Sequence, residues 1–360
     1  MFTHPQLKFN IKSLLKFLGR VDEEKLKKRL AKFFPEKNIV FTDSGRSALQ
    51  LAIKELGLEN SEMLIPAYIC SNLLLIFEHY NIKPIYLDIN LTTFNVVNSE
   101  IEHKITPRTK SILVCHTYGL LNDMDKIMAL VKKHNLKIIE DCAHLPPGLP
   151  RSSKASQGND CAFFSFPKFL PVINGGMLVY KNPIKINLKK CGFKISNLIK
   201  LVRLCPYLAT FSEKFRQSYD KINKFTEPRK PFKCSLKIFD WYLNDLENQI
   251  SKRTKLAKYF QEELKKLGFQ ISPGTTYVSA LVPKNIDRDE LFKKLRKRRI
   301  FCSRIWYQPI YHPLRQLADG ELPNTVEAAR RIINFPLQNW FKKKDVERII
   351  KKLKRTIADI

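Results

Sequence analysis

Short apolar runs alternate with segments of helical periodicity between residues 36 and 180. The run NIVFT precedes RSALQLAIKEL, EMLIPAYIC precedes SNLLLIFEHYN, and SILVC precedes DMDKIMALVKKHN. Runs that are apolar at nearly every position indicate strands with both faces buried. Because helices between such strands cover both faces, the pattern predicts an α/β fold with a mostly parallel central sheet flanked by helices.

The pattern changes after about residue 183. Residues 184–235 are rich in lysine and in helix-like apolar spacing but poor in strands, and one long helix is expected over 236–267. The strand-like GFQISPG and TYVSALVP follow, then a basic helix in DRDELFKKLRKRRI and a final helix at 343–358. We therefore predict an N-terminal helical segment at 1–35, a large α/β domain at 36–235 with an atypical basic helical segment at 184–235, and a smaller α+β domain at 236–360.

The net charge of +30 in 360 residues suggests nucleic acid as a first partner. The basic residues are, however, spread over the whole length, mainly on helix-like segments such as DEEKLKKRLAKFF and DVERIIKKLKRTI, and lysine outnumbers arginine. Neither zinc-finger spacing nor an RNP-type aromatic motif accompanies them. This distribution is typical of a solvated surface, and we expect no nucleic-acid partner.

The eight cysteines occur singly, and several lie inside apolar runs, as Cys115 does in SILVCHTYG and Cys142 in KIIEDCAH. This usage is typical of reduced, buried side chains in a cytoplasmic protein, and we expect neither disulfides nor a metal site. No apolar run approaches the roughly 20 residues that cross a bilayer. The N-terminus lacks the pattern of a signal peptide, because lysines interrupt its apolar positions.

Polar residues follow the predicted strands at their carboxyl ends, where ligands bind in parallel α/β sheets. The first are Ser44 to Ser47, which follow NIVFT and open a helix. Gly45 permits a tight turn, the free N–H groups of a helix start attract anions, and Arg46 adds a charged fork suited to phosphate. The same residues could also be an ordinary N-cap serine followed by a surface arginine.

Asp141 and Lys168 follow two later strands. Asp141 ends KIIED, where it could cap a helix or hold a nearby cationic ring nitrogen protonated, and His144 lies three residues on. Lys168 lies inside the apolar FFSFPKFLPVI, where burial would favour a neutral, nucleophilic amine; alternatively only its stem packs and its head reaches water. The glycines at 175 and 176 indicate a close approach of the backbone to another element.

A phosphate cradle, a carboxylate for a pyridinium nitrogen and a lysine for a Schiff base are together what pyridoxal phosphate requires. Their order along the chain resembles the fold-type-I pyridoxal-phosphate enzymes. More narrowly, the chain resembles the DegT/StrS group of nucleotide-sugar aminotransferases from about residue 38 to 182 and again near the C-terminus. The matching segments are SGRSALQLAIKEL, LIPAYICSN, TPRTKSILVCHTYGLLNDMDKI, IIEDCAH, WYQPIYHPL and ARRIINFPLQ.

The resemblance implies a set of site residues. It makes Lys168 and Asp141 catalytic, the first as the Schiff-base lysine and the second as partner of the pyridine nitrogen. It places these residues at the cofactor: Gly45, Arg46, Ser47, Tyr68, Cys70, Asp141, His144 (near the phenolic oxygen), Ser165 and Lys168. It implies these substrate-binding residues: Tyr118, Tyr307 and His312.

The chain also departs from the family. SFPK is two residues shorter than the family's Ser-Phe-x-x-x-Lys, so Ser165 could fall short of the phosphate, although the lysine keeps its place before the glycines. The ring-covering position aligns with Cys70, which is not aromatic, so Tyr68 is expected to cover the ring instead. Residues 184–235 do not match the family segment that normally helps to form the dimer.

The resemblance implies transamination from an amino donor, usually glutamate, to a keto sugar on a nucleotide carrier, in polysaccharide or secondary-metabolite biosynthesis. It also implies a homodimer with shared active sites, acting on small molecules. Relatives that dehydrate sugars replace the lysine with histidine, so Lys168 argues against dehydration. Arg304 and Arg315 could meet the substrate diphosphate, although ordinary surface charge is the alternative reading for each.

Two other functions stay open. One is a different pyridoxal-phosphate reaction on a non-sugar or lipid-linked substrate, because a fold does not fix a function. The other is a noncatalytic regulator with weak membrane-surface association, since LKFNIKSLLKFLGR and KISNLIKLVRL are basic and amphipathic. Packing of their apolar faces on the protein itself is the favoured alternative.

Overall fold

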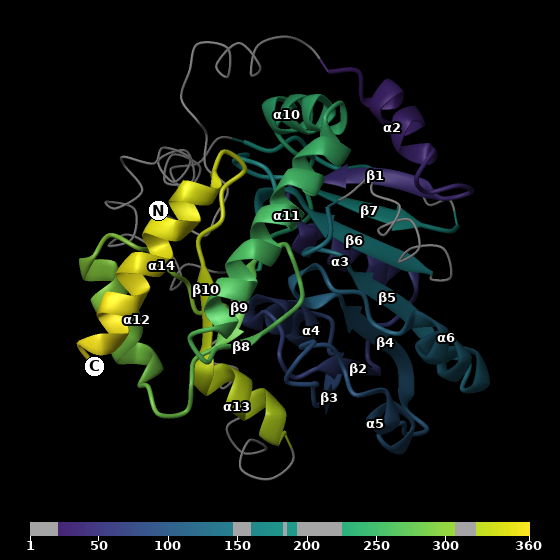
Figure 1. Ribbon diagram of the computed structural model, residues 1–360. Coiled ribbons are helices and arrows are strands. Elements are labelled where there is room, and N and C mark those ends of the chain that lie inside the picture. Colours follow the sequence, from purple (N-terminus) through teal and green to yellow (C-terminus); the bar gives the residue numbers. More distant parts are fainter. Residues whose placement is uncertain (1–20, 147–159, 183–185, 193–224, 307–321) are drawn as a thin grey trace.

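The computed structural model describes residues 21–146, 160–182, 186–192, 225–306 and 322–360 (Figure 1). Several predictions concern residues outside these ranges and stay predictions: those for Tyr307, His312, Arg315 and the two basic amphipathic segments 7–20 and 194–204. In the ranges that are described, no helix combines the length and the apolar character needed to cross a membrane.

A seven-stranded sheet forms the large α/β part, in the order β1-β7-β6-β5-β4-β2-β3. Its strands are β1 Asn38–Thr42, β2 Glu62–Pro66, β3 Lys83–Leu87, β4 Thr109–Cys115, β5 Lys137–Asp141, β6 Cys161–Ser165 and β7 Gly176–Tyr180. Strands β2 to β6 pair in parallel, whereas β7 runs antiparallel to both β1 and β6. The predicted α/β fold with a mostly parallel sheet is confirmed.

Helices cover both faces of this sheet because its pleat sends successive side chains to opposite layers (Figure 1). Phe163 packs in the layer with α3 and α4, whereas its neighbour Phe164 packs with α2 and α10. Farther along the sheet, Ile138 packs with α5 and α6. These helices are α2 Glu23–Ala31, α3 Gly45–Glu55, α4 Leu74–His79, α5 Asn98–His103, α6 Met124–Lys133 and α10 Lys233–Leu243. Single 3-10 turns lie at η1 Ser71–Leu73, η2 Thr117–Gly119 and η3 Phe166–Lys168.

A second, smaller sheet forms the C-terminal part, in the antiparallel order β10-β9-β8. Its strands are β8 Gln270–Ile271, β9 Val278–Leu281 and β10 Ile332–Phe335. Its helices are α11 Leu246–Lys265, α12 Arg288–Lys297, α13 Pro323–Arg331 and α14 Lys343–Ala358. The final helix therefore spans the residues that the sequence predicted.

The single long helix expected over 236–267 is wrong, because the chain breaks between α10 and α11. Asn244 ends the first helix and Asp245 precedes the second, with a φ of −128°. Asn and Asp compete with helical hydrogen bonding and favour helix ends. The core also changes inside α11, since Leu246 packs with the large sheet and Phe260 with the small one. The predicted division at residues 235 and 236 stays a prediction.

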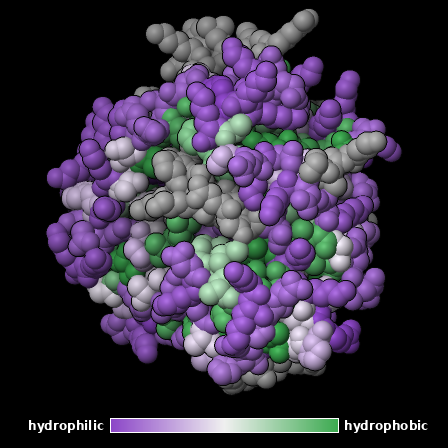
Figure 2. Space-filling model, turned by 90° about the vertical axis from the view of Figure 1, so that its right-hand side faces the viewer, coloured by the Kyte–Doolittle hydropathy of each residue, from purple (hydrophilic) through white to green (hydrophobic). Residues whose placement is uncertain are grey.

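Hydrophilic residues cover most of the face drawn in Figure 2, with small apolar areas between them. Helix α14 is an example of how the basic charge is placed: Lys351, Lys354 and Arg355 are exposed while Leu353 is buried. This placement fits the solvated surface that the sequence pattern predicted.

Candidate functional site

The turn between β1 and α3 is built as an anion site would be. Ser44 is the N-cap of α3 and its hydroxyl accepts a hydrogen bond from the N–H of Ser47 at 3.1 Å. The N–H groups at the start of this 11-residue helix face the carboxyl end of β1, and half-buried Arg46 lies beside them. The N-cap reading of the sequence is therefore confirmed. The phosphate reading stays compatible with it, because a capped helix start still attracts anions.

The two glycines after Lys168 bring β7 against this turn. A Cβ on Gly176 would lie 2.4 Å from the carbonyl carbon of Ser44, so only glycine permits the approach. Gly175 has a φ of +132°, and a Cβ there would lie 2.6 Å from the ring of Phe166. The close approach that the two glycines indicated is therefore the contact between β7 and the turn at Ser44. Ser165 also lies there, its Cβ 3.3 Å from the position of a Cβ on Gly45.

Asp43 fixes the turn, and the sequence pattern did not single it out. Its Oδ1 accepts a hydrogen bond from the hydroxyl of fully buried Ser47 at 2.6 Å. Its backbone N–H donates to the carbonyl of Arg229 at 2.7 Å and its carbonyl accepts from the N–H of Gly175 at 2.8 Å. Ser47 is therefore engaged inside the turn, and its predicted contact with a cofactor stays a prediction.

Asp141 holds a carboxyl group in a buried position at the end of β5. Its Oδ1 accepts a hydrogen bond from the N–H of Ala143 at 2.8 Å, and the residues up to 146 form turns rather than a helix for it to cap. Burial raises the pKa of Asp141 to about 6, although Lys168 and His116 act in the opposite direction. A site of this kind favours a positively charged partner, because a cation offsets the cost of burying the carboxylate.

Lys168 ends η3 and is half-buried, close to Asp141. Burial lowers the pKa of its amine, but four side chains around it outweigh burial and raise the pKa above its ordinary value: Tyr277, Cys70, Asp141 and Cys115. The expectation that the apolar setting favours a neutral amine is therefore wrong for the protein without a cofactor. The apolar neighbours in sequence are not the groups that face the amine in space.

His144 lies fully buried beside Lys168 as a neutral ring. Burial, with a smaller effect of Lys168, holds the pKa of His144 well below its usual range. Its Nδ1 accepts a hydrogen bond from the N–H of Tyr118 at 3.2 Å, so the proton of the neutral ring is on Nε2. The ring of His144 stacks on Trp306, with centroids 5.2 Å apart.

Tyr68 and Tyr118 lie in a buried aromatic cluster next to His144. Their hydroxyls are 2.7 Å apart, and that of Tyr68 also donates to the carbonyl of Ile305 at 2.8 Å. Both side chains are fully buried. The predicted roles of Tyr68 in covering a ring and of Tyr118 in binding a substrate stay predictions. Cys70, at the aligned position, is half-buried and faces the amine of Lys168.

A buried pair of a histidine and a glutamate next to Asp141 was not predicted from the sequence. His116 Nε2 lies 2.7 Å from Glu140 Oε2, and both side chains are fully buried. Because the N–H of Asn122 donates to His116 Nδ1 at 3.2 Å, Nε2 carries the proton and donates to Glu140. The backbone N–H of His116 donates to the carbonyl of Asp141. A signal was present in the sequence: Glu140 is a carboxylate inside the otherwise apolar run KIIED.

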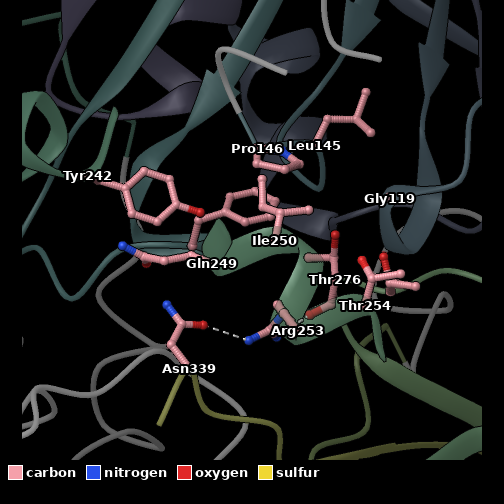
Figure 3. Close-up of a pocket in the computed structure, with 12 residues that line it drawn as sticks. Gly119, Leu145, Pro146, Tyr242, Gln249, Ile250, Arg253, Thr254, Thr276 and Asn339 are labelled. Atoms are coloured by element: carbon pink, nitrogen blue, oxygen red, sulfur yellow. Dashed lines mark hydrogen bonds between the residues drawn. The ribbon is translucent and has the colours of Figure 1, made fainter. Parts of the chain in front are cut away.

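A cavity of about 300 Å³ adjoins these residues from the side of α11 (Figure 3). Its lining includes the residues that directly follow Tyr118, His144 and Lys168 in the sequence, namely Gly119, Leu145 and Phe169. Arg253 of α11 also lines it and donates to Asn339 Oδ1 at 3.1 Å and to the carbonyl of Thr276 at 2.5 Å. Arg253 thus joins α11 to the segment before β9.

Arg304 was considered for a substrate diphosphate. In the structure its guanidinium lies 2.5 Å from Asp289 Oδ1 and 4.3 Å from the centroid of the Phe292 ring. These contacts support the reading of Arg304 as an ion-paired surface residue.

Comparisons with known proteins show which family the sequence matches. The model of the DegT/DnrJ/EryC1/StrS aminotransferase family matches residues 17–198 and 232–354. The dTDP-3-amino-3,6-dideoxy-alpha-D-galactopyranose transaminase of Aneurinibacillus thermoaerophilus is 25% identical over 352 residues, which cover 94% of this chain and 90% of that protein. The GDP-perosamine synthase of Caulobacter vibrioides is 34% identical over 156 residues, 42% of each chain.

Solved structures share the fold. The aminotransferase TlmJ from Streptoalloteichus hindustanus superposes with a TM-score of 0.72 at 18% identity, over 100% of this chain and 99% of that chain. The predicted fold class is confirmed by this likeness to aminotransferase structures. The family match spans most of the sequence on both sides of residues 199–231, which lie in the segment that the sequence comparison found atypical. The chain belongs to the DegT/DnrJ/EryC1/StrS aminotransferase family.

Proposed function

We propose that this chain is a pyridoxal-phosphate-dependent aminotransferase that delivers an amino group to a keto sugar on a nucleotide carrier. One observation carries the proposal: the turn at Ser44, the carboxyl of Asp141 and the amine of Lys168 all follow the carboxyl ends of strands that point the same way. The named activities of the relatives, a dTDP-sugar transaminase and a GDP-perosamine synthase, support the substrate class.

The residues present fit the cofactor. Asp141 is a buried carboxyl with a raised pKa, so a nearby cation would stabilise its ionised form. A protonated pyridine nitrogen is such a cation. The start of α3 with Arg46 would hold the phosphate, Lys168 would hold the cofactor through its amine, and the Nε2–H of His144 would be the donor for the phenolic oxygen. When bound, pyridoxal phosphate supplies an electron sink for the carbon that gains or loses the amino group.

The protein's own part in the reaction is to hold and move protons. Lys168, once released by the amino donor, would take the proton from the donor's α-carbon and deliver it as general acid and base. Asp141 would keep the ring nitrogen protonated, since an ionised carboxylate close to that nitrogen favours the N–H form. His144 would remain neutral throughout, because burial disfavours its cationic form.

The test is the absorption spectrum of the purified protein with pyridoxal phosphate, compared with Lys168→Ala. We expect a visible band in the wild type alone, lost on addition of glutamate and restored by a keto sugar nucleotide. Lys137→Ala, an exposed lysine on β5, is the matched control and should keep the band. A band that persists in Lys168→Ala, or that no amino donor removes, would contradict the proposal.

We also propose a cytoplasmic homodimer whose subunits share their active sites. All seven cysteines in the described residues are free thiols, four of them buried, which supports a reducing compartment. Light scattering of the purified protein should give twice the mass of 42.1 kDa. A monomer that is active at all concentrations would contradict shared sites. Sedimentation with anionic vesicles tests the weak membrane association considered above. If the association exists, the protein should sediment with the vesicles at moderate salt.

A further inference from the structure

Tyr277 has a buried hydroxyl that forms no hydrogen bond with any of the described residues. The side chain is 2% exposed, and its hydroxyl oxygen is unpaired within the described part of the chain. Leaving a buried polar group unpaired is unfavourable, so this hydroxyl requires an explanation. Tyr277 directly precedes β9 in the small domain, and the sequence pattern marked it only as part of a strand.

The backbone next to Tyr277 is fixed to the site on three sides. The N–H of Thr276 donates to the carbonyl of Tyr118 at 3.2 Å, and its hydroxyl donates to the carbonyl of His144 at 2.7 Å. Arg253 donates to the carbonyl of Thr276 from α11. A side chain anchored in this way keeps its place through the reaction, which is what a positioning group requires.

The ring of Tyr277 faces the groups around the reactive lysine. Its centroid is 5.3 Å from that of His144 and 6.1 Å from that of Tyr118. Of the groups that raise the pKa of Lys168, Tyr277 has the largest effect. The titratable groups facing this amine are Tyr277, Cys70, Asp141, Cys115 and His144.

We propose that Tyr277 is a positioning residue of the reaction: its hydroxyl oxygen accepts a hydrogen bond from the protonated amine of Lys168 and holds that amine for proton transfer. The inference rests on the proposed function. Lys168 gains a proton when it acts as a base, and a hydrogen bond to that ammonium favours the step. The phenol itself neither gains nor loses a proton.

Tyr277→Phe removes the hydroxyl and keeps the ring. Tyr80→Phe is the matched control, because Tyr80 also has a buried hydroxyl without a partner, but its ring packs in another core cluster beside His79 and Phe225. Both variants keep a ring of nearly the same volume, so both should fold. Three quantities are measured for each: kcat, KM for the amino donor, and the rate at which the cofactor-free protein develops its absorption band with pyridoxal phosphate at a fixed mildly alkaline pH.

The two rates should change in opposite directions in Tyr277→Phe. Without the hydrogen bond the ammonium form is less stable, so kcat should fall about 10- to 100-fold with little change in KM. More of the amine is then neutral, so cofactor capture should be several-fold faster than in the wild type. Tyr80→Phe should leave both rates unchanged.

A merely structural defect would slow both rates together, and that result would overturn the inference. A wild type that captures the cofactor and transaminates, beside a Tyr277→Phe with unchanged rates, would overturn the inference and leave the proposed function intact. A wild type that never captures pyridoxal phosphate would overturn both.

Discussion

Asp141 shows how a single side chain can make a protein depend on its ligand. In the protein without a cofactor, burial raises the pKa of this carboxyl from its ordinary value of 3.8 to about 6. Between these two values the folded state binds more protons than the unfolded state. Stability must therefore fall as the pH rises through this range and stay lower above it.

Replacing Asp141 with Asn should remove this penalty, because the amide cannot ionise and its oxygen can still accept from the N–H of Ala143. Above about pH 6, the cofactor-free Asp141→Asn protein should be more stable than the wild type by about 2–3 kcal/mol, and the two should converge near pH 4. Thermal melts across this pH range measure the difference. Equal melting temperatures at every pH would show that Asp141 is not strained by burial.

The sequence located Asp141 and Lys168 but not the electrostatics around them. Both residues lie where a local pattern marks a strand end, and that pattern is visible in one segment. The groups that raise the pKa of Lys168 come from distant segments, as Cys70 and Tyr277 do, so no window of sequence contains them together. The same reason explains why Tyr277 was missed.

At the scale of elements, β7 and the start of α3 pack in close backbone contact. Gly176→Ala would place a Cβ 2.4 Å from a backbone carbon of Ser44, which cannot move aside as a flexible side chain can. We expect a loss of about 1–3 kcal/mol of stability and weaker binding of pyridoxal phosphate, since the turn must shift. Urea unfolding and a cofactor titration measure the two effects.

Gly192→Ala is the control for this prediction. A Cβ at Gly192 meets no atom of the described residues within 4 Å, so the stability of this variant should be close to that of the wild type. If Gly176→Ala were equally harmless, the turn would be more adaptable than its packing indicates.

The elements themselves were predicted where their signal is local and strong. The apolar strands β1, β2, β4 and β5 and the helix α14, whose apolar face repeats regularly, have the positions that the pattern predicted. The break between α10 and α11 was missed because apolar spacing continues across Asn244 and Asp245. Only the caps interrupt the helix there, and periodicity does not detect them.

At the scale of the whole molecule, Asp88 links the two sheets. It follows β3 of the large sheet, is buried, and accepts from the N–H groups of Asn324 and Thr325 at the start of α13. The hydroxyl of Thr325 donates to the same carboxylate at 2.7 Å. A residue next to the large sheet thus supplies the cap for a helix that belongs to the C-terminal part.

Asp88→Ala should therefore destabilise the protein by about 2–3 kcal/mol, because it removes a cap and leaves buried N–H groups unpaired. Asp123→Ala is the control: Asp123 caps α6 within its own domain at an exposed position, so the loss should be about 1 kcal/mol or less. Thermal unfolding measures both. A smaller effect for Asp88→Ala than for Asp123→Ala would contradict a role of Asp88 in joining β3 to α13.

The pairing of β1 with β7 also joins two segments that the ribosome synthesises at well-separated times. Residue Asn38 of β1 lies opposite Tyr180, and in the described sheet β1 has β7 as its neighbour. The turn at Ser44 leaves the ribosome before β7, the strand that packs against it. Contacts between such distant segments form slowly, because a long loop must close first. The edge of β1 that pairs with β7 therefore stays unpaired until most of the large sheet has been synthesised, and an unpaired strand edge favours aggregation.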